Sequence, residues 1–215
     1  MVVGAESCAR TLIEHGCPPE KIKVVNYGYD PHLFKMERPT RIIDPRKPIN
    51  FLFAGEIGPR KGAAYLLQAI ANLPEDQFKL TLVGNLAIPE TTFKRFSKRV
   101  THHPQVARSK MPAFFKEADC FIFPSLFEGS ALVLYEAIAS GLGIIQSSQS
   151  GAGIQNGRNG KFIENISVPN LIDSMSLLEA NRGLCEQWQA YSWDTRKNFT
   201  WDTYFSKISE VVNEI

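Results

Sequence analysis

Short apolar runs separated by helix-forming stretches dominate the pattern of hydrophobic and polar positions along this chain. The runs are Ile49–Ala54, Phe78–Val83, Cys120–Phe123 and Leu142–Gln146. None of them alternates strictly between apolar and polar residues. Strands that are buried on both faces have this continuous apolar character, so we predict four such strands.

Helical periodicity fills the intervals between these runs. Leu66, Leu67, Ile70 and Leu73 fall on one stripe of a predicted helix, and residues 131–140 form a second one that ends before Gly141. Alternating strands and helices imply right-handed crossovers, hence an α/β fold. We expect a Rossmann-like three-layer sandwich with a mainly parallel sheet of about six strands. Ligands of such sheets bind in the crevice beyond the carboxyl ends of the strands.

The two ends of the chain carry further predicted elements. Residues 5–17 read as a helix that is followed by Pro18-Pro19 and a short strand, Lys23–Val25. Near the other end, Tyr204, Ile208 and Val211 line one face of a final helix. We expect that face to pack on this domain or on another one, rather than on lipid.

Composition and charge narrow the class of protein. The chain has 215 residues, of which 44% are hydrophobic and 21% charged, and its formal net charge is +2. These values suit one sizeable globular domain, and they do not favour nucleic acid or a membrane surface as a partner. No apolar run approaches the roughly 20 residues that span a bilayer, and the first residues do not resemble a signal peptide.

Cysteine and histidine usage points to a reduced, cytosolic chain without a metal site. Cys8, Cys17, Cys120 and Cys185 show no CxxC spacing, which favours inert thiols. The adjacent pair His102-His103 lies in a polar stretch that we interpret as a surface loop.

The sharpest chemical signal is the segment from Pro124 to Ala137, where an apolar strand ends, a turn follows and a helix begins near Ser130. Glu128 precedes four backbone amides that the helix start leaves exposed, those of Gly129, Ser130, Ala131 and Leu132. These amides and the helix dipole form an anion site. Glu136 follows about two turns later, which places the two carboxylates on the order of 10 Å apart. That span suits a molecule with hydroxyl groups at both ends and a diphosphate between them. A plainer interpretation is also open: Glu128 would merely favour the dipole, and Glu136 would be an ordinary exposed residue.

A second candidate loop follows the strand Ile49–Ala54. Gly55 ends that strand, Gly62 opens a helix, and Arg60 and Lys61 stand between them. Two cations at this position can neutralise a diphosphate leaving group without a metal. A solvated pair of basic residues is the alternative.

Together these motifs resemble the family 4 retaining glycosyltransferases, the group that includes glycogen synthase and mannosyltransferase-like enzymes. Glu128 and Glu136, with seven residues between them, are similar to the family's two-glutamate motif. The preceding 118–125 and following 137–141 segments, the linker-like Asn26–Asp30 with Phe34, and the loop with Gly55 and Arg60–Gly62 match in the same order. The similarity runs from about residue 5 to the end of the chain.

The resemblance implies a role for each matching residue. Glu128 would hold hydroxyl groups of the transferred sugar, and Glu136 those of the ribose. Lys61 would contact the phosphates; many members carry an assisting arginine directly after the first glycine, where this chain has Glu56, so Arg60 is the candidate here. Gly84 and the segment around Arg108 would lie near the base or ribose, although a core turn and surface charge explain these residues equally well.

The glycine-rich segment Gly151–Gly157 also invites a dinucleotide interpretation. Its run of Asn and Gly reads as a loop rather than a helix start, which argues against a nicotinamide cofactor. It aligns with the family's glycine-rich loop but lacks the acidic residue that commonly follows, and Gly143 replaces a usual proline.

The resemblance predicts one half of a GT-B fold, divided into residues 1–34 (the end of an N-terminal domain and a linker), 35–192 (the nucleotide-sugar-binding domain) and 193–215 (a C-terminal helix). The expected function is transfer of a sugar from a nucleoside-diphosphate sugar to an acceptor with retention of configuration, with no cofactor and no metal. The acceptor-binding domain is expected to be missing, so the chain would be a fragment or half of a split enzyme, inactive alone. We expect a cytoplasmic location, with any membrane contact made by that missing half.

Three other functions fit parts of the sequence. One is a regulatory module that binds nucleotide sugar without catalysis. Another is a related two-domain enzyme, such as a sugar-nucleotide epimerase or a phosphorylase. The third is a nicotinamide oxidoreductase.

Overall fold

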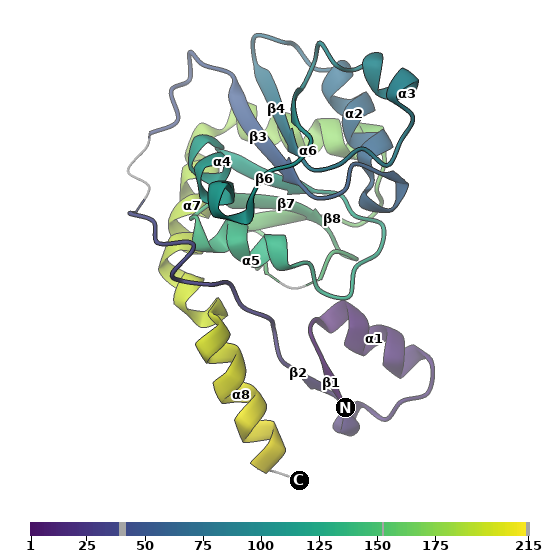
Figure 1. Cartoon of the computed structure of the whole chain (residues 1–215), viewed down its shortest axis with the longest axis vertical. Coiled ribbons are helices and arrows are strands. Elements are labelled where there is room, and N and C mark those ends of the chain that lie inside the picture. Colours follow the sequence, from purple (N-terminus) through teal and green to yellow (C-terminus); the bar gives the residue numbers. More distant parts are fainter. Residues whose placement is uncertain (39–41, 152, 214–215) are drawn as a thin grey trace.

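A computed structural model of the chain, which describes residues 1–38, 42–151 and 153–213, contains a six-stranded sheet in which every pair of neighbouring strands is parallel (Figure 1). The strand order is β5-β4-β3-β6-β7-β8. The bounds are β3 Ile49–Ala54, β4 Phe78–Val83, β5 Thr101–His103, β6 Cys120–Phe123, β7 Gly143–Ser147 and β8 Gly160–Ile163. The predicted α/β class and sheet of about six parallel strands are confirmed.

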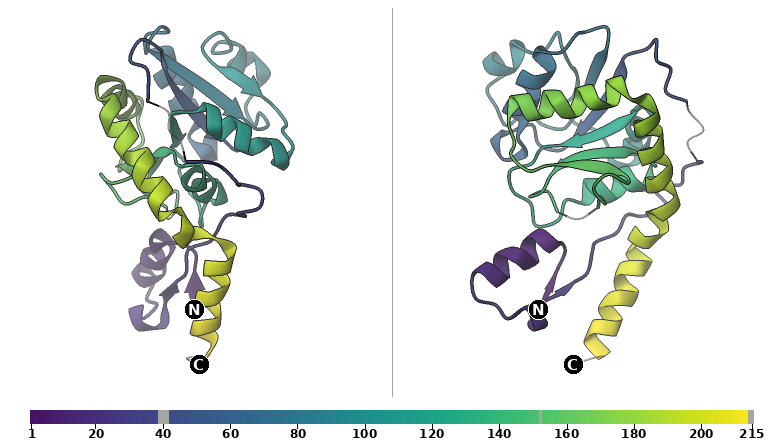
Figure 2. Two further views of the ribbon diagram at one scale, coloured as in Figure 1. Left: turned by 90° about the vertical axis from the view of Figure 1, so that its left-hand side faces the viewer. Right: turned by 180° about the vertical axis from the view of Figure 1, so that it is seen from behind.

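Helices cover both faces of this sheet. Figure 1 shows α4 and α5 in front of it, and the opposite view in Figure 2 shows α6 across the other face. The helices of the domain are α2 Ala63–Ala71, α3 Glu90–Lys94, α4 Met111–Glu117, α5 Leu132–Ala139, α6 Val168–Ala180 and α7 Arg182–Thr195, with short 3-10 segments η2 Pro59–Lys61, η3 Arg108–Lys110 and η4 Arg196–Phe199. Three layers result, as the sequence predicts.

The central strands β3 and β6 consist almost entirely of apolar residues because both of their faces are covered. Phe51 and Phe53 on β3 and Phe121 and Phe123 on β6 are fully buried. The rings of Phe53 and Phe123 stack with centroids 5.8 Å apart, and those of Phe121 and Phe123 stack at 5.9 Å. This aromatic packing between neighbouring strands holds β3 beside β6.

Helix α5 ends at the position that the sequence predicts. Gly141 has φ 71°, its amide donates to Ile138, and the amide of Leu142 donates to Ala137. These two bonds form a Schellman motif, which needs a residue that tolerates the left-handed conformation. The predicted end of this helix is therefore confirmed, while β7 begins and ends one residue later than predicted.

The first residues form a small unit beside the main domain. Strands β1 Val2–Val3 and β2 Lys23–Val24 pair in parallel, and α1 Glu6–Glu14 and η1 Pro19–Lys21 lie between them. The predicted helix over 5–17 is shorter at both ends, and the strand Lys23–Val25 ends at Val24. Figure 2 shows α8, Trp201–Asn213, running alongside this unit.

The linker between this unit and the main domain crosses the segment before α8. The amide of Tyr29 donates to Phe199 at 2.8 Å, and the amide of Trp201 donates to Tyr29 at 3.2 Å. A β-carbon on Gly28 would lie 2.3 Å from the carbonyl carbon of Thr200. Only glycine allows the two backbones to approach this closely, which explains the glycine in the linker motif.

The final helix leaves apolar side chains uncovered. No residue of α8 is buried, and Phe205 and Val212 are 60% and 62% exposed. Among the residues that the structure describes, no helix combines the length and apolar character required to cross a bilayer.

Candidate functional site

The strand order creates a switch point between β3 and β6. From β3 the chain continues to β4 on one side, while β6 and its successors lie on the other. Loops that leave neighbouring strands in opposite directions open a crevice at the carboxyl edge of the sheet. The loops at this crevice are residues 55–62 after β3 and residues 124–131 after β6, the two that carry the predicted cations and Glu128.

These two loops are packed against each other through their backbones. The amide of Leu126 donates to the carbonyl oxygen of Arg60 at 2.8 Å. Gly62 has φ 68°, and a β-carbon there would lie 2.0 Å from the carbonyl oxygen of Pro124. The glycine that was predicted to open the helix is the N-cap of α2, and it also lets the second loop sit directly on the first.

Glu128 is the centre of a charged cluster at this contact. Its Oε1 accepts hydrogen bonds from Arg60 Nη1 at 2.7 Å and from Lys61 Nζ. The Glu128 and Lys61 side chains are only 11% and 12% exposed, whereas Arg60 is 52% exposed. The structure thus brings together all three residues predicted to be catalytic, with Lys61 as the deeper of the two cations.

Sequence reasoning missed the direct ion pairs within this cluster, since it assigned the glutamate to the sugar and the cations to the phosphates. It also missed Ser125, whose Oγ donates to Glu128 Oε1 at 2.7 Å. The Pro-Ser turn is visible in the sequence, but the turn alone does not say that its hydroxyl faces Glu128. The Lys61 ammonium lies 4.9 Å from the centroid of the Phe123 ring, so an aromatic face supports it from the strand below.

A serine network holds the loop from the adjacent strand β7. Ser147 Oγ donates to the carbonyl oxygen of Ser125 and contacts Ser150 Oγ at 2.6 Å. Ser150 Oγ donates to the carbonyl oxygen of Phe123 at 3.0 Å. Both serines are buried, so these bonds are shielded from water and keep the Glu128 loop in one position.

The start of α5 lies two residues later than predicted, at Leu132 instead of Ser130. Ala131 is the N-cap with extended backbone, φ −76° and ψ 113°, and its amide donates to Ser150 at 3.3 Å. The cause is the long-range bond to Ser150, which helix propensity cannot anticipate. The Ala131 amide is one of the four that were predicted to bind an anion, and it already donates a hydrogen bond within the protein.

Ser130 is linked to the N-terminal unit through the hydroxyl group of Tyr135. Its Oγ lies 2.8 Å from the Tyr135 hydroxyl, which donates to the carbonyl oxygen of Gly4 at 3.4 Å. Burial raises the pKa of Tyr135 to about 12, so this hydroxyl stays protonated. Cys8 Sγ donates to the Gly129 carbonyl oxygen at 2.8 Å. The N-terminal unit thus contacts the candidate anion site directly.

Glu136 lies on α5 and meets Arg108 from η3. Arg108 Nη2 donates to Glu136 Oε1 at 3.3 Å, and the Glu136 side chain is 12% exposed. Burial raises the pKa of Glu136, while the charge and the hydrogen bond of Arg108 oppose that rise. Two residues predicted separately for the ribose side of the donor are therefore in contact.

This contact predicts a change in titration. Replacing Arg108 with glutamine should raise the pKa of Glu136 further, because the cation that favours its ionised form is lost. A carboxyl group with a raised folded-state pKa adds stability at low pH that is lost as the pH rises through that pKa. In the variant this loss should therefore extend to higher pH.

Carbon-detected NMR titration of the labelled glutamate side chains measures the shift, with assignment by Glu136→Gln. Arg95→Gln removes an exposed cation that makes no contact with Glu136 and serves as the control. An unchanged Glu136 midpoint in Arg108→Gln would contradict the electrostatic role of this pair.

Gly55 follows strand β3 and Gly84 follows strand β4, and the two backbones lie in close contact at these glycines. Their φ values are 145° and 143°, and a β-carbon on Gly84 would lie 1.9 Å from the Gly55 carbonyl oxygen. His102 Nε2 lies 2.9 Å from the Gly84 carbonyl oxygen, and His103 packs on Phe114. The prediction of a surface loop for this histidine pair is wrong. Both residues belong to strand β5, which pairs with β4.

The glycine-rich segment is a loop, as predicted, except for Ala152, which lies outside the described residues. A β-carbon on Gly151 would lie 2.9 Å from the Cα of Ser130, so this loop covers the start of α5. Gln146 Nε2 donates to the Gly151 carbonyl oxygen at 3.0 Å and ties the loop to β7. Strand β8 begins at Gly160, after the turn over 157–159.

The cysteines of the chain are free thiols, and two of them lie in the core. All four cysteines are free; Cys120 and Cys185 are buried, and burial raises the pKa of both thiols. Within residues 1–38, 42–151 and 153–213, no group of three or more His, Cys, Asp or Glu side chains is arranged to hold a metal ion.

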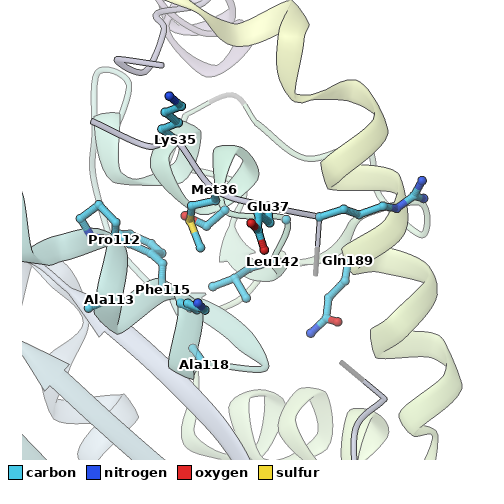
Figure 3. A pocket seen from close by; sticks show the side chains of 13 residues that line it. Lys35, Met36, Glu37, Pro112, Ala113, Phe115, Ala118, Leu142 and Gln189 are labelled. Carbon is cyan, nitrogen blue, oxygen red and sulfur yellow. The ribbon is translucent and has the colours of Figure 1, made fainter. Parts of the chain in front are cut away.

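A cavity of about 650 Å³ lies at the opposite edge of the sheet (Figure 3). Its lining includes Ala118 and Leu142, which come just before the amino ends of β6 and β7. Met36, Phe115 and Gln189 complete much of the wall seen in Figure 3. The cavity is therefore separate from the crevice that contains Glu128 and Glu136.

Comparison with known proteins identifies the family. The family model described as Glycosyl transferases group 1 matches residues 48–181, more than half of the chain. A D-inositol 3-phosphate glycosyltransferase from Paenarthrobacter aurescens is 24% identical over 97% of this chain and 58% of its own length. The amylovoran biosynthesis glycosyltransferase AmsK from Erwinia amylovora is 29% identical over 65% of this chain and 37% of its own length. The chain thus spans about half the length of the curated relatives it matches.

Solved structures share the fold at low sequence identity. Sucrose-phosphate synthase from Thermosynechococcus elongatus superposes with a TM-score of 0.81 at 19% identity, covering 99% of this chain and 57% of that one. Alr3699/HepE of Anabaena, solved in complex with UDP and glucose, gives a TM-score of 0.80 at 18% identity, covering 100% and 63%. In both cases this chain shares its fold with about three fifths of a longer chain.

Proposed function

Because this chain belongs to the group 1 glycosyltransferases, we propose that its crevice binds a nucleoside-diphosphate sugar and positions the sugar for transfer with retention of configuration. The observation that carries this proposal is the cluster at the β3–β6 switch point, where Lys61 and Arg60 meet Glu128 beneath the start of α5. Cations and a helix N-terminus suit a diphosphate, and carboxylates suit hydroxyl groups.

We assign the parts of the donor along the crevice. Lys61 and Arg60, with the amides of Gly129, Ser130 and Leu132, would stabilise the charge that grows on the departing diphosphate. Glu128 would accept hydrogen bonds from hydroxyl groups of the transferred sugar. Glu136, held by Arg108, would accept those of the ribose, and the Gly84 edge would face the base.

In retaining transfer the acceptor attacks on the face from which the diphosphate leaves. The acceptor hydroxyl loses its proton to the leaving phosphate while the bond to the sugar forms. The two cations favour this step because they take up charge without a metal ion. We therefore propose that donor binding needs no divalent cation.

Transfer would further require an acceptor-binding domain from outside these residues. The relatives and structures named above are longer, since this chain covers 58% of the inositol enzyme and 63% of Alr3699/HepE. We propose that residues 1–34 and α8 adjoin that domain, and that the chain alone transfers little or no sugar. A cytoplasmic setting, with membrane contact confined to the other half, belongs to the same proposal.

Calorimetric titration of the chain with UDP, GDP and ADP, and with their glucose or mannose conjugates, tests the donor site. We expect one nucleotide series to bind selectively, and a chelator such as EDTA to leave that binding unchanged. Glu136→Ala should weaken the selected series about tenfold, since hydrogen bonds to a charged group contribute about 1.5–3 kcal/mol.

Glu164→Ala removes an exposed carboxylate before α6 and is the matched control; its affinities should equal those of the unchanged chain. The donor site would be refuted if no nucleotide bound the folded chain, or if Glu136→Ala and Glu164→Ala had the same effect.

A further inference from the structure

The carboxylate of Glu128 already forms ion pairs with the two cations that a diphosphate would use, and it offsets one of their two charges. We propose that Glu128 acts as an internal counter-anion, which weakens binding of the bare nucleoside diphosphate relative to its sugar conjugate and so speeds release of the product. This inference rests on the proposed donor site and adds a specificity role to the same residue.

The two carboxylate oxygens of Glu128 differ in their hydrogen-bond partners. Arg60 Nη1, Lys61 Nζ and Ser125 Oγ all donate to Oε1. Oε2 has no protein partner among residues 1–38, 42–151 and 153–213. One oxygen thus holds the cations, and the other is available to a sugar hydroxyl.

Burial strengthens the electrostatic interaction of Glu128 with Lys61 and with an approaching phosphate. Glu128 and Lys61 are 11% and 12% exposed, so water screens their pairing poorly. The serine network and the bond from the Glu128 amide to Gln149 at 3.1 Å keep the carboxylate in place. A diphosphate that approaches Lys61 therefore meets a nearby negative charge as well as the cation.

The bare diphosphate and its sugar conjugate experience this carboxylate differently. The terminal phosphate of a free nucleoside diphosphate can lose a second proton, because a phosphate monoester has a second pKa of about 6. It competes with Glu128 for the cations and is repelled by the carboxylate. In the conjugate that phosphate is esterified and carries less charge, and the sugar supplies hydroxyl groups that donate to Oε2.

Once the sugar has left, its hydroxyl groups no longer offset the repulsion between Glu128 and the terminal phosphate. The same residue that helps hold the donor then disfavours the diphosphate product. Glu128 therefore sets the ratio of the two affinities, and this ratio is what an experiment measures.

Titration of the chain and its Glu128→Gln variant with UDP and UDP-glucose, or the corresponding pair of the selected base, tests the proposal. Glutamine keeps the size of the side chain and removes the charge. We expect the bare diphosphate to bind about fivefold more tightly to the variant, the upper end of the effect of one charge pair. The conjugate should gain less or lose affinity, so the preference for it should shrink.

Asp76→Asn is the control because Asp76 is an exposed carboxylate just before β4, at the opposite edge of the sheet from the crevice, without an ion pair among the described residues. Its affinities should stay within about twofold of the original. Glu128→Asp keeps the charge but shortens its reach, so an intermediate gain for the bare diphosphate is expected if the contact with the cations matters.

The outcomes separate the two proposals. If the unchanged chain binds nucleotide and neither folded Glu128 variant binds the bare diphosphate more tightly, the counter-anion role is wrong and the donor site stands. The role is also wrong if Asp76→Asn produces the same gain. If the unchanged chain binds no nucleotide, both proposals fail together.

Discussion

Replacing Gly62 with alanine is expected to destabilise the protein by about 2–5 kcal/mol. Two physical effects add at this position. Gly62 has φ 68°, a conformation that side chains with a β-carbon rarely adopt, and its β-carbon would lie 2.0 Å from the Pro124 carbonyl oxygen. The clash is with backbone, so no side-chain rotation relieves it. The loop of residues 124–131 would have to move away from α2.

Urea unfolding followed by circular dichroism measures this loss, and nucleotide titration of the folded fraction measures its effect on the site. Gly157→Ala separates the two causes, because Gly157 has φ 81° but nothing within 4 Å of its β-carbon position. That control should cost about 1 kcal/mol, from backbone strain alone. Equal losses in the two variants would show that contact with Pro124 is unimportant.

Replacing Lys61 with methionine should reduce the affinity for the selected nucleotide about 30-fold or more, on the basis of about 2 kcal/mol for a shielded charged contact. Methionine preserves the apolar stem that packs near Phe123 and removes only the ammonium group. Arg60 is more than half exposed, so it cannot replace the deeper cation. Calorimetric titration measures the change.

Lys79→Met provides the matched control, since Lys79 is an exposed cation near the amino end of β4, away from the crevice. Its nucleotide affinity should not change. A double variant that combines Lys61→Met with Glu128→Gln tests the coupling of the two residues. If Glu128 acts through Lys61, its substitution should gain little for the bare diphosphate once the lysine is absent. A small loss in Lys61→Met would place the phosphates elsewhere.

The strands that sequence analysis found are rich in apolar residues and mostly buried. The limits of β3, β4, β6 and β7 were predicted to within a residue, although β4 exposes Lys79 on one face. β5 and β8 were missed because they lie at the two edges of the sheet. The residues of β5, Thr101–His103, are polar and exposed or half-buried, so no apolar pattern marks them.

The candidate site, like the strands, was predicted only in part from the sequence. Glu128, Glu136, Arg60 and Lys61 were identified from their place after predicted strands and from the family resemblance, and the loops that carry them do meet at one edge of the sheet. The roles assigned to these residues remain predictions. Ser125 had no assigned role, and Ala131 was expected to offer its amide, which Ser150 occupies.

By itself, the sequence determined the class of fold, the succession of the buried strands and their turns along the chain, and the kind of chemistry each loop can offer. These properties follow from local patterns: apolar runs, helix periodicity, and charges beside glycines. The tertiary structure alone decided which side chains meet. Glu128 pairs with Lys61 across 67 positions of sequence, and Glu136 with Arg108 across 28. Such contacts depend on strand order, which places β6 beside β3 while β4 lies on the other side. The apolar runs do not encode the position of a strand in the sheet, because every buried strand carries such a run.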